Sequence, residues 1–234
     1  MASVAVLLRK IDEGVAEVRE HYEADLAAKE LSDDTLYAIR GVVQDCQSTL
    51  DWTATAVKKK FYPAQRWAPY FPLARRPADF PTQVEKQLRG LLRAHPKVAA
   101  AFERHQPYQP GKTELGYLKA LSNANKHQDF TAQERETMRQ IRAGDERGSI
   151  TFIHAAEQGA TGMWIHPDAQ VSFGGRPVDP TTLAPLDGGP KPYQETIYVD
   201  WRFVDPPVSV LPTLEALADH VREAVEDIRG EAQL

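Results

Sequence analysis

The sequence has almost no cysteine and no long apolar run. Cys46 is the only cysteine among 234 residues, which excludes an intramolecular disulfide and a cysteine-rich metal site. No run of apolar residues is long enough to span a bilayer. The apolar residues near Met1 lack a basic leader and continue at helical spacing, so they predict a helix rather than a signal peptide. We therefore expect a cytoplasmic protein without a membrane partner.

An excess of basic residues is also missing. The chain has 28 Lys and Arg against 33 Asp and Glu, which gives a net charge of −5. This balance argues against nucleic-acid binding over the whole surface, but it leaves room for a local basic patch. Internal repeats and low-complexity tracts are absent as well. The apolar fraction of 42% is that of an ordinary globular protein.

Apolar residues recur at spacings of three and four in four long segments, and this pattern predicts amphipathic helices. The first covers residues 4–26. The second runs from about Thr35 to Phe61, after an N-cap cluster that begins at Ser32. The third follows Thr113 to about His127, with an extension or restart toward Ile141. Pro212 fits the first turn of the last helix.

The period changes to two after residue 148, which predicts strands. The candidates are residues 148–155, 162–166, 170–173 and 197–203, with a Pro- and Gly-rich loop over 177–192. We expect a mainly α protein, an antiparallel four-helix bundle with a small antiparallel β insertion between the third and last long helices. Residues 1–145 would hold the first three long helices, 146–206 the β-rich insertion, and 207–234 the final helix that completes the bundle.

A possible phosphate-binding loop and a possible metal site both lack support from the surrounding residues. Gly111-Lys112-Thr113 looks like the end of a phosphate-binding loop, but Gln106 stands where the first glycine is needed and no strand precedes it. His154 and His166 could approach each other across strands, although ordinary sheet positions explain them as well. We expect no metal and no cofactor.

From Lys58 to Arg76, basic residues are interleaved with aromatic ones and no acidic residue interrupts them. One interpretation is an RNA contact, because cations bind phosphates and exposed rings stack on bases. The other is a solvated helix end followed by a loop whose rings pack on the helices. The candidate RNA-contact residues are Lys58, Lys59, Lys60, Arg66, Arg75 and Arg76.

One face of the third long helix carries Gly116, Ala120, Asn123 and His127 at spacings of four, three and four. The small residues would let another backbone approach, from the same chain or from a second copy. His127 could move a proton, Lys126 could stabilise phosphorane charge, and Asn123 could orient a phosphate. Alternatively, Asn123 bonds a loop and His127 closes the helix end.

Several short stretches occur in a recognisable order: Leu50-Asp51, Tyr70-Phe71-Pro72-Leu73, Phe80, Gln106-Pro107-Tyr108, and Leu121-Ser122-Asn123-Ala124-Asn125-Lys126-His127. They resemble a family of uncharacterised bacterial helical proteins with the pattern LRSALD…FP…QPY…LxNxDKHR. That family is similar to the HEPN superfamily of four-helix domains.

The resemblance implies a metal-independent endoribonuclease that works as a homodimer, in a toxin–antitoxin or phage-defence system with a possible antitoxin partner. In the RxxxxH motif of that superfamily, His127 takes the His position and Asn123 the polar one. Ser122 and Gln47 stand where arginines are usual, whereas Asp51 matches. Losing two cations weakens phosphoryl chemistry. The alternative is therefore a non-catalytic, dimeric helical interaction or nucleotide-binding module.

Overall fold

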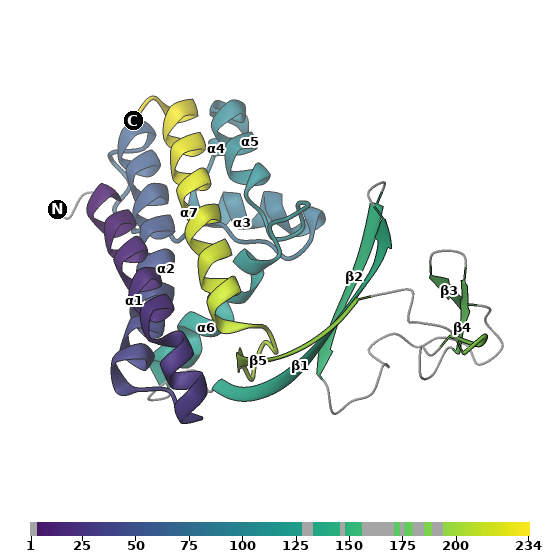
Figure 1. Cartoon of the computed structure of the whole chain (residues 1–234). Helices are drawn as coiled ribbons and strands as arrows, with labels where there is room; N and C mark the ends of the chain where they lie inside the picture. Colours follow the sequence, from purple (N-terminus) through teal and green to yellow (C-terminus); the bar gives the residue numbers. More distant parts are fainter. Residues whose placement is uncertain are drawn as a thin grey trace. The chain divides into compact units, whose positions relative to one another are not determined.

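The computed structural model describes residues 4–127, 133–145, 148–155, 171–173, 176–179, 185–188 and 194–234 (Figure 1). The chain divides into two compact units. One consists of Met1–Gln133 and Phe203–Leu234, and the other of Glu134–Arg202. The first is helical and the second is built of strands. No helix in the described part of the chain is long and apolar enough to cross a membrane.

The long helices of the first unit are α1 (Val4–Ala28), α2 (Asp33–Phe61) and α7 (Val210–Ala232), and each contacts the other two (Figure 1). Their apolar stripes are buried, as the spacing predicted. The Ser32 hydroxyl accepts a hydrogen bond from the backbone N–H of Thr35 and caps α2. Helices α1 and α2 approach closely at Gly14, where an added Cβ would lie 2.6 Å from Cγ2 of Val42.

Shorter helices follow α2 in the sequence. They are η1 (Pro77–Asp79), α3 (Phe80–Gln87), α4 (Leu91–Ala94) and α5 (Pro96–Arg104), and α6 (Glu114–His127) follows them. Helix α5 packs on α7, while α6 packs on α2 and α7. Leu115, Leu118 and Leu121 of α6 are fully buried in this packing. The packing of α6 on α2 places the candidate residues of both helices near each other.

The second unit is a β structure. Strands β1 (Gln133–Asp145), β2 (Gly148–Ala155) and β5 (Gln194–Phe203) form a sheet in the order β2-β1-β5. Strands β1 and β2 are antiparallel, with Met138 opposite Ala155 and Asp145 opposite Gly148. A separate antiparallel pair is formed by β3 (Val171–Phe173) and β4 (Arg176–Val178).

The mainly helical fold is confirmed, and so are strands between α6 and α7. The extension of the third helix toward Ile141 is wrong, because these residues belong to β1 and pair with β2. Residues 134–145, expected in the helical part of the chain, thus lie in the second unit. The expected loop 177–192 includes the end of β4 and a bridge between Val178 and Pro185. The predicted strand 162–166 lies outside the described residues.

Candidate functional site

A cavity of about 340 Å³ opens where α2 and α6 meet the segment 70–73 and α3; we call it the α2–α6 cavity. Gln47 and Asp51 reach it from α2, and Ser122 and Asn123 from α6. The structure therefore brings together four candidate residues that are distant in the sequence. The remaining lining residues are Tyr70, Phe71, Leu73, Gln83, Lys86, Gln87 and Lys119.

Ser122 is the buried polar residue of this cavity. Only 2% of its surface is exposed, and its Oγ has no hydrogen-bond partner among the described residues. Buried hydroxyl groups in native proteins usually have a partner, since an unpaired one costs free energy. The next residue, Asn123, is exposed. The wall of the cavity thus contains a buried hydroxyl with spare hydrogen-bonding capacity, and the residue after it on α6 carries a solvated amide.

Three side chains hold the segment 70–74 over the cavity by accepting hydrogen bonds from its backbone. Asp51 Oδ1 accepts from the N–H of Phe71 at 2.8 Å, and Gln106 Oε1 from that of Ala74 at 2.8 Å. Gln87 Oε1 accepts from the N–H of Tyr70 at 3.0 Å. The acidic residue and the Gln-Pro-Tyr stretch that carried the resemblance are therefore parts of one loop anchor.

Gln47 stands where an arginine was expected. Its Nε2 donates to Asp51 Oδ1 at 3.1 Å, one helical turn away on α2. The amide supplies the carboxylate with a hydrogen bond but no positive charge. Asp51 thus keeps its anchor while Gln47 adds no cation for a phosphate.

The cavity does contain cations, which the sequence analysis missed. Lys86 of α3 and Lys119 of α6 line it, and neither side chain has an ion pair among the described residues. Lys119 lies four residues before Asn123, so the helical spacing could have placed it on the same face. Lys86 gave no such signal, because its approach depends on how α3 packs.

A neighbouring cavity of about 430 Å³ shares Leu73, Gln83, Lys119 and Asn123 with the first. It is also lined by Arg75, an exposed candidate for RNA contact. The two cavities therefore lie next to each other along α6, and Lys119 and Asn123 line both; we call the pair the hollow.

The small residues on this face of α6 face other parts of the same chain. A Cβ at Gly116 would lie 3.2 Å from Cβ of Pro107, so the close approach expected there is already made by the segment before α6. Ala120 lines the neighbouring cavity. A homodimer through this face stays a prediction.

Lys126 and His127 occupy the last turn of α6. The structure describes the helix backbone to His127 and its side chains as far as Asn123. The proposed roles of both residues in proton transfer and charge stabilisation stay predictions.

The basic stretch from Lys58 to Arg76 is not a continuous cationic surface. Lys58 is buried and its ammonium donates to the carbonyl of Gln65, while Lys60 Nζ donates to the carbonyl of Gln233 at 2.8 Å. Arg76 forms a two-pronged ion pair with Asp79 at 2.9 and 3.0 Å. These three cations therefore already have partners within the chain.

The other three cations of this stretch differ in their surroundings. Lys59 also has an interaction partner. Arg66 and Arg75 are exposed, and only Arg75 reaches the hollow. Direct RNA contact by the six residues stays a prediction.

Another polar cluster joins α5, α6 and α7. His105 Nε2 lies 2.9 Å from Asp227 Oδ2. The Asp227 carboxylate also accepts two hydrogen bonds from the guanidinium of Arg104. His220 Nδ1 lies 3.7 Å from a carboxylate oxygen of Glu114. Burial lowers the pKa of both histidines below the usual 6.5. No group of three or more possible metal ligands forms in the part of the chain that the structure describes.

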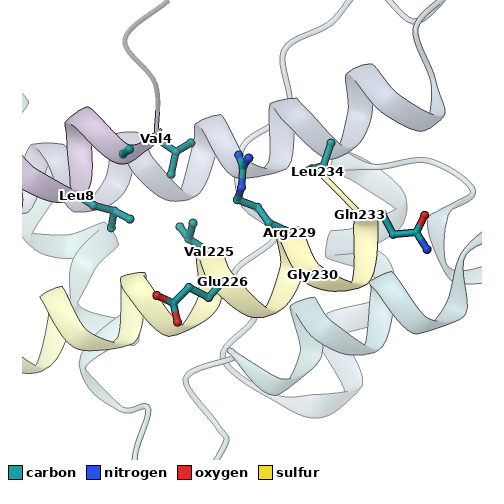
Figure 2. Close-up of a pocket in the computed structure, with 9 residues that line it drawn as sticks. Val4, Leu8, Val225, Glu226, Arg229, Gly230, Gln233 and Leu234 are labelled. Atoms are coloured by element: carbon teal, nitrogen blue, oxygen red, sulfur yellow. The ribbon is translucent and has the colours of Figure 1, made fainter.

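A groove of about 530 Å³ runs between the start of α1 and the end of α7 (Figure 2). Its walls include Val4, Leu8 and Val225, with Glu226 and Arg229 as the charged residues. It contains none of the candidate site residues.

Comparison with known proteins gives no relative. No family model matches the chain, and no curated protein and no solved structure matches it either.

Proposed function

We propose that this is a HEPN-like RNA-binding protein, in which α1, α2, α6 and α7 are the four bundle helices and the α2–α6 cavity binds RNA phosphates. The observation that supports this most strongly is the composition of the cavity. It combines Lys86 and Lys119 with the buried Ser122 hydroxyl and the Asn123 amide. Ammonium, hydroxyl and amide N–H groups are the usual donors to phosphate oxygens.

The presence of two neighbouring cavities favours a polymer over a single mononucleotide. The neighbouring cavity continues along α6 and adds Arg75, while Lys119 belongs to both cavities. A strand with phosphates at regular intervals can contact cations in both cavities at once. The acidic net charge of the whole chain argues against binding over the entire surface, so a local site of this kind is the one to expect.

Cleavage is a separate step of the proposal and depends on His127. The 2′-oxygen of the RNA would attack the adjacent phosphorus and the 5′-oxygen would leave, which gives a 2′,3′-cyclic phosphate and a free 5′-hydroxyl. His127 would transfer a proton to or from one of these oxygens. Cleavage should therefore proceed in EDTA and be lost in His127→Ala. Cleavage that needs magnesium, or that survives the substitution, contradicts this step.

Binding is tested with a labelled single-stranded RNA by fluorescence anisotropy over a range of salt concentrations. In Lys86→Ala/Lys119→Ala, we expect about a tenfold loss of affinity at low salt. The slope of log K against log salt should also become shallower by about 1.4, or about 0.7 for each lost phosphate contact.

The matched control is Lys10→Ala/Lys97→Ala, which removes two exposed lysines outside both cavities and changes the net charge equally. It should keep the wild-type affinity and slope. Equal losses in the two double variants would show that only overall charge matters, and would contradict the assignment of the cavity.

A further inference from the structure

Two large rings remain exposed in the segment that follows α2. Trp67 is 40% exposed and Tyr70 is 65% exposed. Their neighbour Phe71 is buried, with its ring centroid 5.2 Å from that of Phe102. The segment therefore buries one ring in the core and leaves two others partly exposed at the surface.

Trp67 and Tyr70 are both hydrogen-bonded to the last residue of α3, Trp67 through its ring and Tyr70 through its backbone. Trp67 Nε1 donates to the carbonyl oxygen of Gln87 at 3.3 Å, and the Tyr70 N–H donates to Gln87 Oε1 at 3.0 Å. The guanidinium of Arg89 lies 5.8 Å from the centroid of the Trp67 ring. These contacts fix the indole and the tyrosine backbone before any ligand arrives, which lowers the entropy cost of binding.

Tyr70 adjoins the proposed phosphate site. Tyr70 and Gln87 both line the α2–α6 cavity, together with Lys86 and Lys119. An exposed aromatic face beside a cationic cavity matches the two chemical parts of a nucleotide, a flat base and a charged phosphate. Aromatic stacking on bases tolerates any sequence, since every base has a π face.

We propose that Tyr70, with Trp67 beside it, is a stacking site for unpaired bases of the RNA strand whose phosphates occupy the α2–α6 cavity. This inference rests on the proposed function and adds a requirement for accessible base faces. Paired bases are stacked inside a duplex and cannot reach the rings. The site should therefore select strands that are unpaired where they cross the cavity, without selecting their sequence.

The test compares two oligomers of equal length and charge, an oligoadenylate and an oligomer of abasic residues. Wild-type protein should bind the oligoadenylate about tenfold more tightly, a typical effect of one stacked base. Tyr70→Ala should remove most of this difference without changing affinity for the abasic oligomer. Tyr70→Phe keeps the ring and should keep the difference. Tyr37→Ala is the matched control, because Tyr37 is 63% exposed but lies outside both cavities.

The outcomes separate this inference from the proposed function. Equal affinity of the wild type for both oligomers, or an unchanged preference in Tyr70→Ala, overturns the stacking site while phosphate binding stands. Binding of neither oligomer overturns the proposed function and the stacking site with it. Circular dichroism of each variant establishes that it is folded.

Discussion

Gln106 connects the fold to the site, and its substitution has a calculable cost. The side chain is fully buried; it accepts from the N–H of Ala74 and donates to the carbonyl of Phe102, both at 2.8 Å. Gln106→Met keeps the size of the side chain and removes both hydrogen bonds. A buried polar group left unpaired costs about 1–3 kcal/mol. Two groups lose their partner, so we expect the free energy of unfolding to fall by about 2–6 kcal/mol, measured by urea denaturation and circular dichroism.

Gln109→Met is the matched control from the same segment. Gln109 Nε2 also donates to a carbonyl of α5, that of Glu103, but its side chain does not bond Ala74. The Glu103 carbonyl also accepts from the N–H of Gln106, so the loss should be about 1 kcal/mol or less. Hydrogen exchange at Ala74 should accelerate only in Gln106→Met. Equal destabilisation by the two substitutions, with equal exchange at Ala74, would refute the anchoring role.

The remaining predictions concern packing and pH. Gly14→Ala should destabilise the protein by about 1 kcal/mol, because the Cβ clash with Val42 exceeds the gain in helix propensity, whereas Gly41→Ala, with open space around it, should stabilise it by about 0.5–1 kcal/mol. Urea denaturation of both variants checks this, and a stabilised Gly14→Ala would be contrary to it. The lowered pKa values of His105 and His220 mean that the unfolded chain takes up protons first as pH falls. Stability should be complete above about pH 6.5 and decrease as the pH falls below it. His220→Asn should weaken that decrease in urea titrations, and an unchanged pH profile would argue against it.

The ends of the long helices were predictable because local signals define them. The Ser32 cap and the apolar stripes predicted α1, α2 and α7 closely. Strand β1 was missed because its sequence is largely polar and rich in residues that favour helices. Its strand conformation comes from pairing with β2, and such pairing is not encoded in a local period.

The candidate site was predictable only in part. The resemblance pointed to Gln47, Asp51, Ser122 and Asn123, and the structure places all four around one cavity. It did not reveal that Asp51 anchors a loop or that Lys86 supplies charge from α3. Those facts depend on how distant segments pack, which no spacing in the sequence records.

The location of bound RNA tests the central claim most directly. Photo-crosslinking of a thiouridine-substituted single strand, followed by mass spectrometry of the crosslinked peptides, identifies the protein segments that touch it. We predict crosslinks in the segment around Tyr70, in α3 near Lys86, and in α6 near Lys119. Crosslinks confined to the groove between α1 and α7 (Figure 2), with none at these three places, would contradict the account.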